Sequence, residues 1–454
     1  MDLGNKTVLV AGTGISGMGA MELLVKTDAE LILYDGNTEL TVEGIQAKLP
    51  ETDKKIEIII GELTENVIKK IDIAVLSPGI PTDVPFVNQM RDAGVLIWGE
   101  LELADQFAKG SVVAITGTNG KTTTTTLVGE ILKNHFDDVF VVGNIGTAYA
   151  GVALDTTENS QVVAETSSFQ LETIDEFHPI VSAILNLTPD HLNRHHTMEG
   201  YVEAKKNIMK NQTADDYVIL NYDDPLTRAI GEKAVPQVIY FSSTQILENG
   251  YYFHDRKIYY AENGETEIIC SANGLKILGL HNMENIMAAV AMARCINVPM
   301  DKIRETITSF MGVEHRIEYV TEKQGVSYYN DSKGTNPDAA IKAIQAMVRP
   351  TILIGGGYDK DSTYDEWIEA FDGKVRYLVL MGETANKIAE CARRHGFHEI
   401  IMVESLEEAV KVSASKAENG DAVLLSPACA SWDMFKSYEV RGRMFKEFVH
   451  QLAD

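Results

Sequence analysis

One strand-to-helix stretch carries the residue types that hold nucleotide phosphates. In "VVAITGTNGKTT", an apolar run precedes Gly117, Thr118, Asn119, Gly120, Lys121, Thr122 and Thr123. The backbone N–H groups of such a loop cradle phosphates, the lysine reaches the terminal ones, and a threonine hydroxyl can contact Mg²⁺. Ile115 stands where the full Walker pattern has its first glycine. The stretch predicts an ATP phosphate loop; the alternative is a Gly-Asn turn with a solvated lysine.

Acidic and imidazole side chains follow two later strands of the same region. The run "SQVVAE" ends at Glu165, and "VSAILNL" leads into "TPDHLNRHH", which contains Asp190 and His191. We expect these two strand ends to lie at the same sheet edge, one strand apart. A carboxylate and an imidazole near a phosphate loop can hold divalent ions. A lone Glu or His is more often structural, but the three features together favour a nucleotide site with two metal ions.

A second phosphate fingerprint lies near the N-terminus. The stretch "KTVLVAGTGISGMGAMELLV" contains the complete G-x-G-x-x-G pattern, and "ELILYD" ends at Asp35, where a dinucleotide enzyme would hold a ribose. This pattern recognises a pyrophosphate and not nicotinamide in particular. It therefore leaves open an NAD site, another diphosphate site, or a Gly-rich turn needed only for close helix packing.

The elements that must position these residues alternate between strands and helices. Short apolar strands separated by helix-length stretches predict an α/β fold with parallel sheets. We expect three domains, at residues 1–103, 104–312 and 313–454. Within the central one, a strand-rich part with the pairs Asn249-Gly250, Asn263-Gly264 and Asn273-Gly274 predicts hairpins in a small added β layer.

Composition narrows the classes of partner. There are 40 Lys and Arg against 66 Asp and Glu, which gives a net charge of −26 and does not suit a nucleic-acid or anionic membrane partner. The four cysteines are scattered without CxxC spacing, which argues against a zinc or disulfide framework. We find neither a leader nor an apolar run approaching 18 residues, so we expect a soluble cytoplasmic protein.

Seven motifs together resemble the Mur ligases, and the resemblance covers all three expected domains. The motifs are "TGTNGKT", "ETSSFQL", "NLTPDHLNRH", "LGLHNMENIMAA", "EHRIEYV", "YYNDSKGTNPDA" and "SPACASWDMFKSYEVRG". The last two are most similar to the D-glutamate-adding members. The resemblance implies a Rossmann-like N-terminal domain, a central P-loop ATP-binding domain and a Rossmann-like C-terminal domain. It also implies a cytoplasmic enzyme, expected as a monomer, that joins D-glutamate to UDP-N-acetylmuramoyl-L-alanine through an acyl phosphate, with ATP and two Mg²⁺ ions.

The resemblance assigns roles to particular residues. The first fingerprint would hold the UDP end of the substrate and not NAD, through Gly14, Ile15, Ser16, Asp35, Gly36, Ser77 and Gly79, with Asn144 contacting the muramoyl part. The phosphate loop with Asn282, Asn285, Arg316 and Asp331 would bind ATP. The D-glutamate residues would be Thr335, Lys360, Ser431 and Tyr438. The expected metal and catalytic residues are Lys121, Thr122, Glu165, His191, Lys205 and Lys333, with Lys205 carbamylated and its neighbour Lys206 as the alternative position.

Two positions depart from a related enzyme, and three rival functions stay open. Asn37 stands where the relative has arginine, and Tyr438 where it has phenylalanine. A nucleotide-dependent dehydrogenase would leave the second loop and the third domain unexplained. A folylpolyglutamate-type ligase would not need the first fingerprint. A regulatory nucleotide sensor would be expected to lack the lysine or metal residues, which are all present here.

Overall fold

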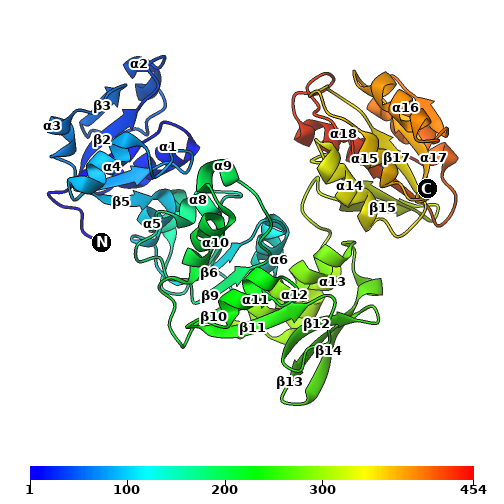
Figure 1. The fold of residues 1–454 in the computed structure, drawn as a ribbon, viewed down its shortest axis with the longest axis horizontal. Coiled ribbons are helices and arrows are strands. Elements are labelled where there is room, and N and C mark those ends of the chain that lie inside the picture. The colour runs from blue at the N-terminus through cyan, green and yellow to red at the C-terminus, as the bar shows by residue number, and fades with distance from the viewer. Residues whose placement is uncertain (454) are drawn as a thin grey trace. The chain divides into compact units, whose positions relative to one another are not determined.

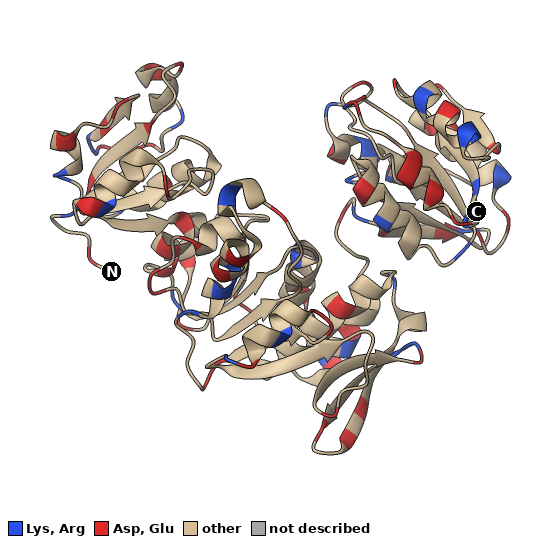
Figure 2. Cartoon of the chain, in the orientation of Figure 1, with Lys and Arg blue, Asp and Glu red and all other residues tan. Residues whose placement is uncertain are grey.

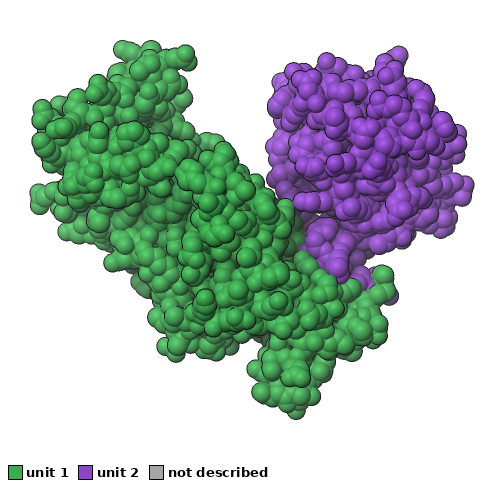
Figure 3. Space-filling view, in the orientation of Figure 1, with its two compact units in different colours: residues 1–270, 284–306 green, residues 271–283, 307–454 purple. Residues whose placement is uncertain are grey.

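The computed structural model describes residues 1–453 and contains three sheets in successive parts of the chain (Figure 1). The chain divides into two compact units, coloured separately in Figure 3. Unit 1 comprises residues 1–270 and 284–306, and unit 2 comprises residues 271–283 and everything from residue 307 onward. Unit 1 holds the first two sheets and unit 2 the third. The finer division at 103/104 and 312/313 stays a prediction.

The first sheet is parallel and has five strands. In sheet order these are β3 (Ile56–Ile60), β2 (Glu30–Asp35), β1 (Thr7–Ala11), β4 (Ile73–Leu76) and β5 (Leu96–Gly99). Strands β1 and β4 are almost wholly buried, as expected for apolar runs covered on both faces. The strand order reverses at β1 and β4, so the loops after these two strands flank a crevice. The helices of this part are α1 (Ile15–Leu24), α2 (Val42–Gln46), α3 (Glu65–Ile68), α4 (Pro85–Asp92) and α5 (Glu100–Asp105).

The second sheet has nine strands, and the last seven in the order below pair in parallel. In sheet order these are β14 (Glu265–Ser271), β13 (Lys257–Glu262), β12 (Gly250–His254), β11 (Gln237–Ser242), β10 (Tyr217–Asn221), β9 (Val181–Ile184), β6 (Ser111–Thr116), β8 (Gln161–Glu165) and β7 (Val139–Gly143). Strand β6 therefore lies between β8 and β9. The expectation that Glu165 and His191 follow neighbouring strands was wrong, because the phosphate-loop strand separates them.

Helices connect these strands, and two more α-helices follow the last strand before the third sheet begins in the sequence. The helix α6 (Lys121–Lys133) begins directly after the phosphate loop. The others are α7 (Tyr149–Val152), η1 (Ala153–Asp155), α8 (Ser168–Leu171), α9 (Leu192–His195), α10 (Met198–Lys206), η2 (Asn207–Met209), α11 (Pro225–Gly231), η3 (Ala272–Gly274), α12 (Leu280–Cys295) and α13 (Met300–Ser309).

The expected added β structure is present as an extension of the central sheet, but only one of the three Asn-Gly pairs forms a hairpin turn. Asn263-Gly264, with both residues at positive φ, lies between the neighbouring strands β13 and β14. Gly250 instead begins β12, and Asn273-Gly274 lies in η3. The turn between the antiparallel strands β12 and β13 is made by Asp255-Arg256, at φ 45° and 59°.

The third sheet has six strands. In sheet order these are β15 (Glu318–Lys323), β16 (Val326–Asn330), β20 (Ala422–Leu425), β17 (Thr351–Gly355), β18 (Val375–Leu380) and β19 (Ile400–Met402), and only the β15–β16 pair is antiparallel. The helices of this part are α14 (Pro337–Ala346), α15 (Asp365–Glu369), α16 (Ala385–Arg394), α17 (Leu406–Lys416) and α18 (Tyr438–His450). The loops after the adjacent strands β16, β20 and β17 therefore meet at one edge.

Charged residues are distributed along the whole chain. Figure 2 shows acidic and basic residues interspersed on helices and loops of both units, with no long basic stripe in this view. Over residues 1–453, no helix combines the length and the apolar character needed to span a bilayer.

Candidate active site

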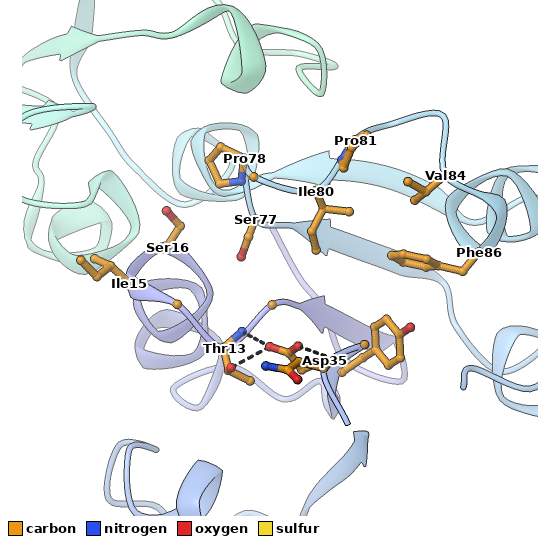
Figure 4. Close-up of a pocket in the computed structure, with 16 residues that line it drawn as sticks. Thr13, Ile15, Ser16, Asp35, Ser77, Pro78, Ile80, Pro81, Val84 and Phe86 are labelled. Atoms are coloured by element: carbon orange, nitrogen blue, oxygen red, sulfur yellow. Dashed lines mark hydrogen bonds between the residues drawn. The ribbon is translucent and has the colours of Figure 1, made fainter. Parts of the chain in front are cut away.

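The crevice of the first sheet holds a cavity of about 630 Å³. Figure 4 shows its walls: the loop after β1, the start of α1, the end of β2 and the loop after β4. Seven of the eight residues expected at the UDP-linked substrate line it, and Asn144 does not. Those seven are Gly14, Ile15, Ser16, Asp35, Gly36, Ser77 and Gly79.

The Asp35 carboxylate is held by its own loops. Thr13 donates to Asp35 Oδ2 from its backbone N–H at 3.0 Å and from its hydroxyl at 2.7 Å, and the Asn37 N–H donates to Oδ1 at 3.0 Å. These hydrogen bonds outweigh burial and lower the pKa of Asp35. Asp35 is therefore a fixed anion at the rim, and Asn37, where a relative has arginine, takes part in fixing it.

Two glycines of the first fingerprint occupy positions where a larger residue would collide with its neighbours. Gly12 lies at φ +99°, and a Cβ there would collide with Ser77. A Cβ on Gly17 would overlap the Gly12 carbonyl oxygen. The buried Ser77 hydroxyl has no hydrogen-bond partner among the described residues. A ligand oxygen in the cavity would satisfy that hydroxyl, because buried polar groups are rarely left unpaired.

The phosphate loop between β6 and α6 is shaped by two glycines in conformations that other residues rarely adopt. Gly117 has φ +151° and Gly120 has φ +86°. Lys121 Nζ donates to the carbonyl oxygens of Gly117 at 2.9 Å and Thr118 at 3.0 Å. The loop thus lies at a helix N-terminus with its lysine folded over it, as anion binding requires.

Glu165 places a buried carboxylate beside this loop, and one of its oxygens has no hydrogen-bond partner among the described residues. Its side chain is 1% exposed. Asn144 Nδ2 donates to Glu165 Oε1 at 2.8 Å, while Oε2 has no hydrogen-bond partner among the described residues. A divalent cation fits this orphaned oxygen, since a buried carboxylate oxygen is costly without a donor or metal. Asn144 therefore orients Glu165 and does not line the cavity of the first sheet.

The structure separates the two candidate lysines of α10. Lys205 is 2% exposed, and its Nζ donates to Gly117 O at 2.9 Å and Thr116 Oγ1 at 3.3 Å. Burial, and then the charge of Lys121, lower the pKa of Lys205 to about 7. Lys206 instead pairs with Glu203 at 3.2 Å on the surface. Only Lys205 lies at the phosphate loop.

His191 lies on the segment after β9 with its ring against Phe169. The two ring centroids are 4.8 Å apart, and about half of the His191 side chain is exposed. The backbone of His191 has φ 51°, and its N–H donates to Asp190 Oδ1 at 2.9 Å. The ring nitrogen Nε2 lies 3.5 Å from Asp190 Oδ2, so the half-exposed imidazole and this carboxylate face solvent together, and both could ligate a metal ion.

The two asparagines of α12 have different surroundings. Thr124 donates to Asn285 Oδ1 at 3.3 Å, and a Cβ on Gly120 would collide with the same oxygen. Asn282 Nδ2 donates to Leu278 O at 2.7 Å. Asn285 therefore touches the phosphate loop, whereas Asn282 caps the turn that precedes its own helix.

In unit 2, Asp331 lies buried where β16 ends. Its Oδ2 accepts from Ser426 at 2.7 Å and its Oδ1 from the Ile317 N–H at 3.2 Å. Burial is the largest influence and raises the pKa of Asp331 to about 7, although Arg316 acts against it. The expected nucleotide residues Arg316 and Asp331 are thus electrostatic neighbours.

The loop after β16 is tied to the start of α18 by a buried arginine that the sequence reasoning missed. Arg441 donates to Ser332 Oγ at 2.9 Å, to Ser332 O at 2.8 Å and to Cys429 O at 3.2 Å. Lys333 follows Ser332, and its Nζ lies 6.0 Å from the Tyr438 ring centroid. The only feature of the sequence that could have indicated the role of Arg441 is a charged residue among the buried residues of α18.

The four residues expected at D-glutamate come from the adjacent loops of the third sheet. Thr335 follows β16, Lys360 follows β17, Ser431 follows β20, and Tyr438 begins α18. Lys360 Nζ lies 5.0 Å from the ring centroid of Trp432, an exposed residue that the sequence reasoning did not single out. Three neighbouring strands thus bring these loops to one sheet edge.

Three family models match successive parts of the chain. They are described as "Mur ligase MurD-like, N-terminal domain" over residues 6–99, "Mur ligase middle domain" over 115–293, and "Mur ligase, glutamate ligase domain" over 315–429. Solved structures agree in fold. The UDP-N-acetylmuramate-alanine ligase MurC from Thermotoga maritima has TM-score 0.57 at 21% identity, covering 97% of this chain and 98% of that one.

Curated relatives match over the whole length. The UDP-N-acetylmuramoylalanine–D-glutamate ligase of Lachnoclostridium phytofermentans is 56% identical over 454 residues, covering 100% of both chains. The enzymes of the same name from Lachnospira eligens and Clostridioides difficile are 53% and 46% identical, again with 100% of both chains covered. Identity at this level over 100% of both chains, together with the three matching models, shows that this chain belongs to the Mur ligase family.

Proposed function

We propose that this chain joins D-glutamate to UDP-N-acetylmuramoyl-L-alanine, using ATP, in the synthesis of peptidoglycan precursors. The observation that carries the proposal is the 56% identity over 100% of both chains with a ligase of that name. The geometry agrees, because the cavity of the first sheet and the phosphate loop of the second offer separate sites to two phosphate-bearing ligands.

The reaction needs an activated acyl group. A carboxylate is a poor acyl donor, so a substrate carboxylate oxygen attacks the γ-phosphorus of ATP. The bond to the β,γ-bridging oxygen breaks, ADP leaves, and an acyl phosphate forms. The amine of D-glutamate then attacks the acyl carbon, and inorganic phosphate leaves. Several anionic groups meet in these steps, so catalysis depends on positioning and on neutralising charge.

The residues around the phosphate loop fit this requirement. We assign Lys121 to the transferred phosphoryl group, and Thr122, Glu165 and His191 to holding two Mg²⁺ ions. The unpartnered Glu165 Oε2 supports a cation at that point. Mg²⁺ would supply neutralisation of the phosphate charge. The loop residues Gly117, Thr118, Asn119, Gly120 and Thr123 would cradle the phosphates through their backbone.

The remaining assignments concern the nucleotide, the amino acid and the UDP end. Asn282 and Asn285 are proposed for adenine, and Arg316, Asp331 and Lys333 for the nucleotide and the reacting groups. D-Glutamate carries two carboxylates and needs two sets of donors. The proposed sets are Thr335 with Lys360, and Ser431 with the backbone at Tyr438. The residues that line the cavity of the first sheet would hold the UDP end.

Lys205 is proposed to work as a carbamate. The neutral amine adds to the carbon of CO₂ and loses a proton, which replaces a cation beside Glu165 by an anion that can ligate Mg²⁺. Support comes from the burial of Lys205 and from its lowered pKa of about 7, which makes the neutral amine accessible. We expect Lys205→Ala to lose activity and to regain part of it with short carboxylates, while the control Lys206→Ala stays active. Full activity of Lys205→Ala would sink the assignment.

Release of phosphate tests the proposed reaction. With UDP-N-acetylmuramoyl-L-alanine, ATP and Mg²⁺ present, we expect phosphate release to depend on added D-glutamate. Calorimetry measures binding of UDP and of NAD, and only UDP should bind. This distinguishes the proposed function from the alternative interpretation of the first fingerprint as part of a dehydrogenase. Release that ignores D-glutamate, or tight NAD binding without UDP binding, would refute the proposal.

We further propose that the enzyme works as a monomer in the cytoplasm, without a nucleic-acid or membrane partner. The net charge of −26 supports the absence of nucleic-acid and membrane partners, because it repels polyanions and anionic lipid. Light scattering after size exclusion should give the mass of one chain, 50.0 kDa. A dimer mass would contradict the proposal.

A further inference from the structure

Arg194, on α9, joins two parts of unit 1 that are far apart in sequence. Its Nη2 donates to Ile80 O at 2.9 Å, in the loop after β4 that lines the cavity of the first sheet. The same guanidinium donates to the Glu172 carboxylate at 2.5 Å from Nη2 and at 3.2 Å from Nε. Glu172 is the C-cap of α8, beside the central sheet. One planar side chain, only 9% exposed, thus holds a carbonyl of the cavity wall and a carboxylate of the central part.

The same arginine also sets the surroundings of His191. Its Cζ lies 5.0 Å from the centroid of the Phe169 ring, within the range of a cation–π contact. The Phe169 ring packs in turn against His191 at 4.8 Å. The Phe169 ring therefore contacts both the Arg194 guanidinium and the His191 imidazole.

A second route leads from Glu172 to the phosphate loop. Glu172 Oε1 lies 3.1 Å from His195 Nδ1, and the His195 ring centroid lies 5.4 Å from that of Tyr201. The Tyr201 hydroxyl shares a hydrogen bond of 3.0 Å with Thr118 Oγ1. Contacts are therefore continuous from the cavity wall, through Arg194 and Glu172, to the loop proposed to bind ATP.

A further contact between the loop after β4 and the segment that follows α9 is weaker. His196 lies 3.2 Å from Asp83, but both side chains are more than 60% exposed. Exposed pairs of this kind contribute little and are screened by salt. A partly buried arginine that binds a carboxylate at two nitrogens and a carbonyl besides is held far more rigidly.

We propose that Arg194 is a positioning residue that couples filling of the UDP cavity to the geometry of His191 and the phosphate loop. The inference rests on the proposed function. A ligand in the cavity contacts the loop that carries Ile80, and Arg194 fixes that loop against the central part. Binding of the UDP-linked substrate and of the nucleotide should then strengthen each other, and reciprocally so.

The test compares Arg194→Ala with Arg91→Ala as a matched control. Arg91, on α4, also donates to this loop, at Thr82 O with 3.2 Å, but its other hydrogen bond goes to Asn88 on the same helix. Calorimetry gives the dissociation constant of the UDP-linked substrate with and without a saturating non-hydrolysable ATP analogue. The ratio of the two constants measures the coupling. We expect a ratio of 5 or more in the wild type, by the usual size of such couplings, falling to about 1 in Arg194→Ala.

Turnover and folding complete the experiment. We expect Arg194→Ala to lose about tenfold or more in kcat, as small misplacements near the chemistry do, while Arg91→Ala keeps both its kcat and its coupling. Arg194→Lys keeps the positive charge but not the planar guanidinium that binds both partners, so it should lose the coupling too. It replaces the alanine variant in the test if that variant fails to fold. A wild-type ratio near 1, or a folded Arg194 variant with unchanged coupling and kcat, overturns the inference. A wild type without D-glutamate-dependent turnover would refute the proposed function instead.

Discussion

Asp331 should make the stability of unit 2 depend on pH. Burial raises the pKa of this carboxyl from 3.8 to about 7 in the folded chain. The folded state then binds the proton more tightly than the unfolded state does. The free energy of unfolding is highest below the unfolded pKa, falls as the pH rises through the interval from about 4 to 7, and has lost the full contribution above it.

The size of this effect follows from the same values. A rise from 3.8 to about 7 corresponds to at most about 4 kcal/mol, of which about 2–3 kcal/mol is lost between pH 5 and 8. Asp331→Asn removes the titration. Its amide oxygen can still accept from the Ile317 N–H, and the Ser426 hydroxyl can accept from the amide nitrogen in place of donating. The variant should therefore gain stability relative to the wild type as the pH rises.

Urea unfolding followed by tryptophan fluorescence at pH 5, 6.5 and 8 measures this difference. Two of the three tryptophans, Trp367 and Trp432, lie in unit 2. Asp359→Asn is the control, because a hydrogen bond from Lys387 lowers the pKa of Asp359. Any stability that Asp359 contributes is lost as the pH falls, which is the opposite direction. A difference between Asp331→Asn and the wild type that is constant from pH 5 to 8, or that favours the wild type at pH 8, refutes the reasoning.

Two further substitutions probe the phosphate loop. Lys121→Ala removes a preorganised cation and should raise the activation barrier that kcat reports by about 3 kcal/mol. Calorimetry should find binding of the UDP-linked substrate nearly unchanged. An equal loss of that binding would mean that the two loops do not serve separate ligands. Gly120→Ala should weaken binding of an ATP analogue and cost about 1–3 kcal/mol of stability in urea unfolding, because φ is +86° and the new Cβ meets Asn285. Gly274→Ala, where the space is open, is its control and should change neither; equal effects at the two glycines would contradict the steric argument.

Local signals predicted the elements well. The β-branched run "VVAIT", followed by Gly117, predicted the strand β6 and its loop. Neighbouring residues indicate both features, since the apolar run is typical of a strand buried on both faces and the glycines precede the start of a helix. The hairpins were harder. Asp255 and Arg256 make a left-handed turn without an Asn-Gly pair, because the pairing of β12 with β13 imposes the turn. Asn273-Gly274 forms a short 3-10 turn instead.

Contacts between residues far apart in the chain could not be predicted from the sequence. The placement of β6 between β8 and β9 depends on crossovers that no local pattern specifies. Arg194 and Ile80 are 114 positions apart, and nothing near either residue indicates that they meet. The prediction that Asn144 contacts the muramoyl substrate stays a prediction. Its hydrogen bond to Glu165 could not be foreseen, because it forms only when β7 and β8 pair side by side.

The choice of amino acid tests the central claim most directly. The protein is incubated with UDP-N-acetylmuramoyl-L-alanine, ATP and Mg²⁺ in an equimolar mixture of D-glutamate, L-glutamate, L-alanine and a diamino acid, with the D-glutamate isotopically labelled. Mass spectrometry of the UDP-linked product should show a single adduct that carries the label, with ADP and phosphate formed in equal amounts. A product carrying any other amino acid, or ATP hydrolysis without a product, would contradict the account.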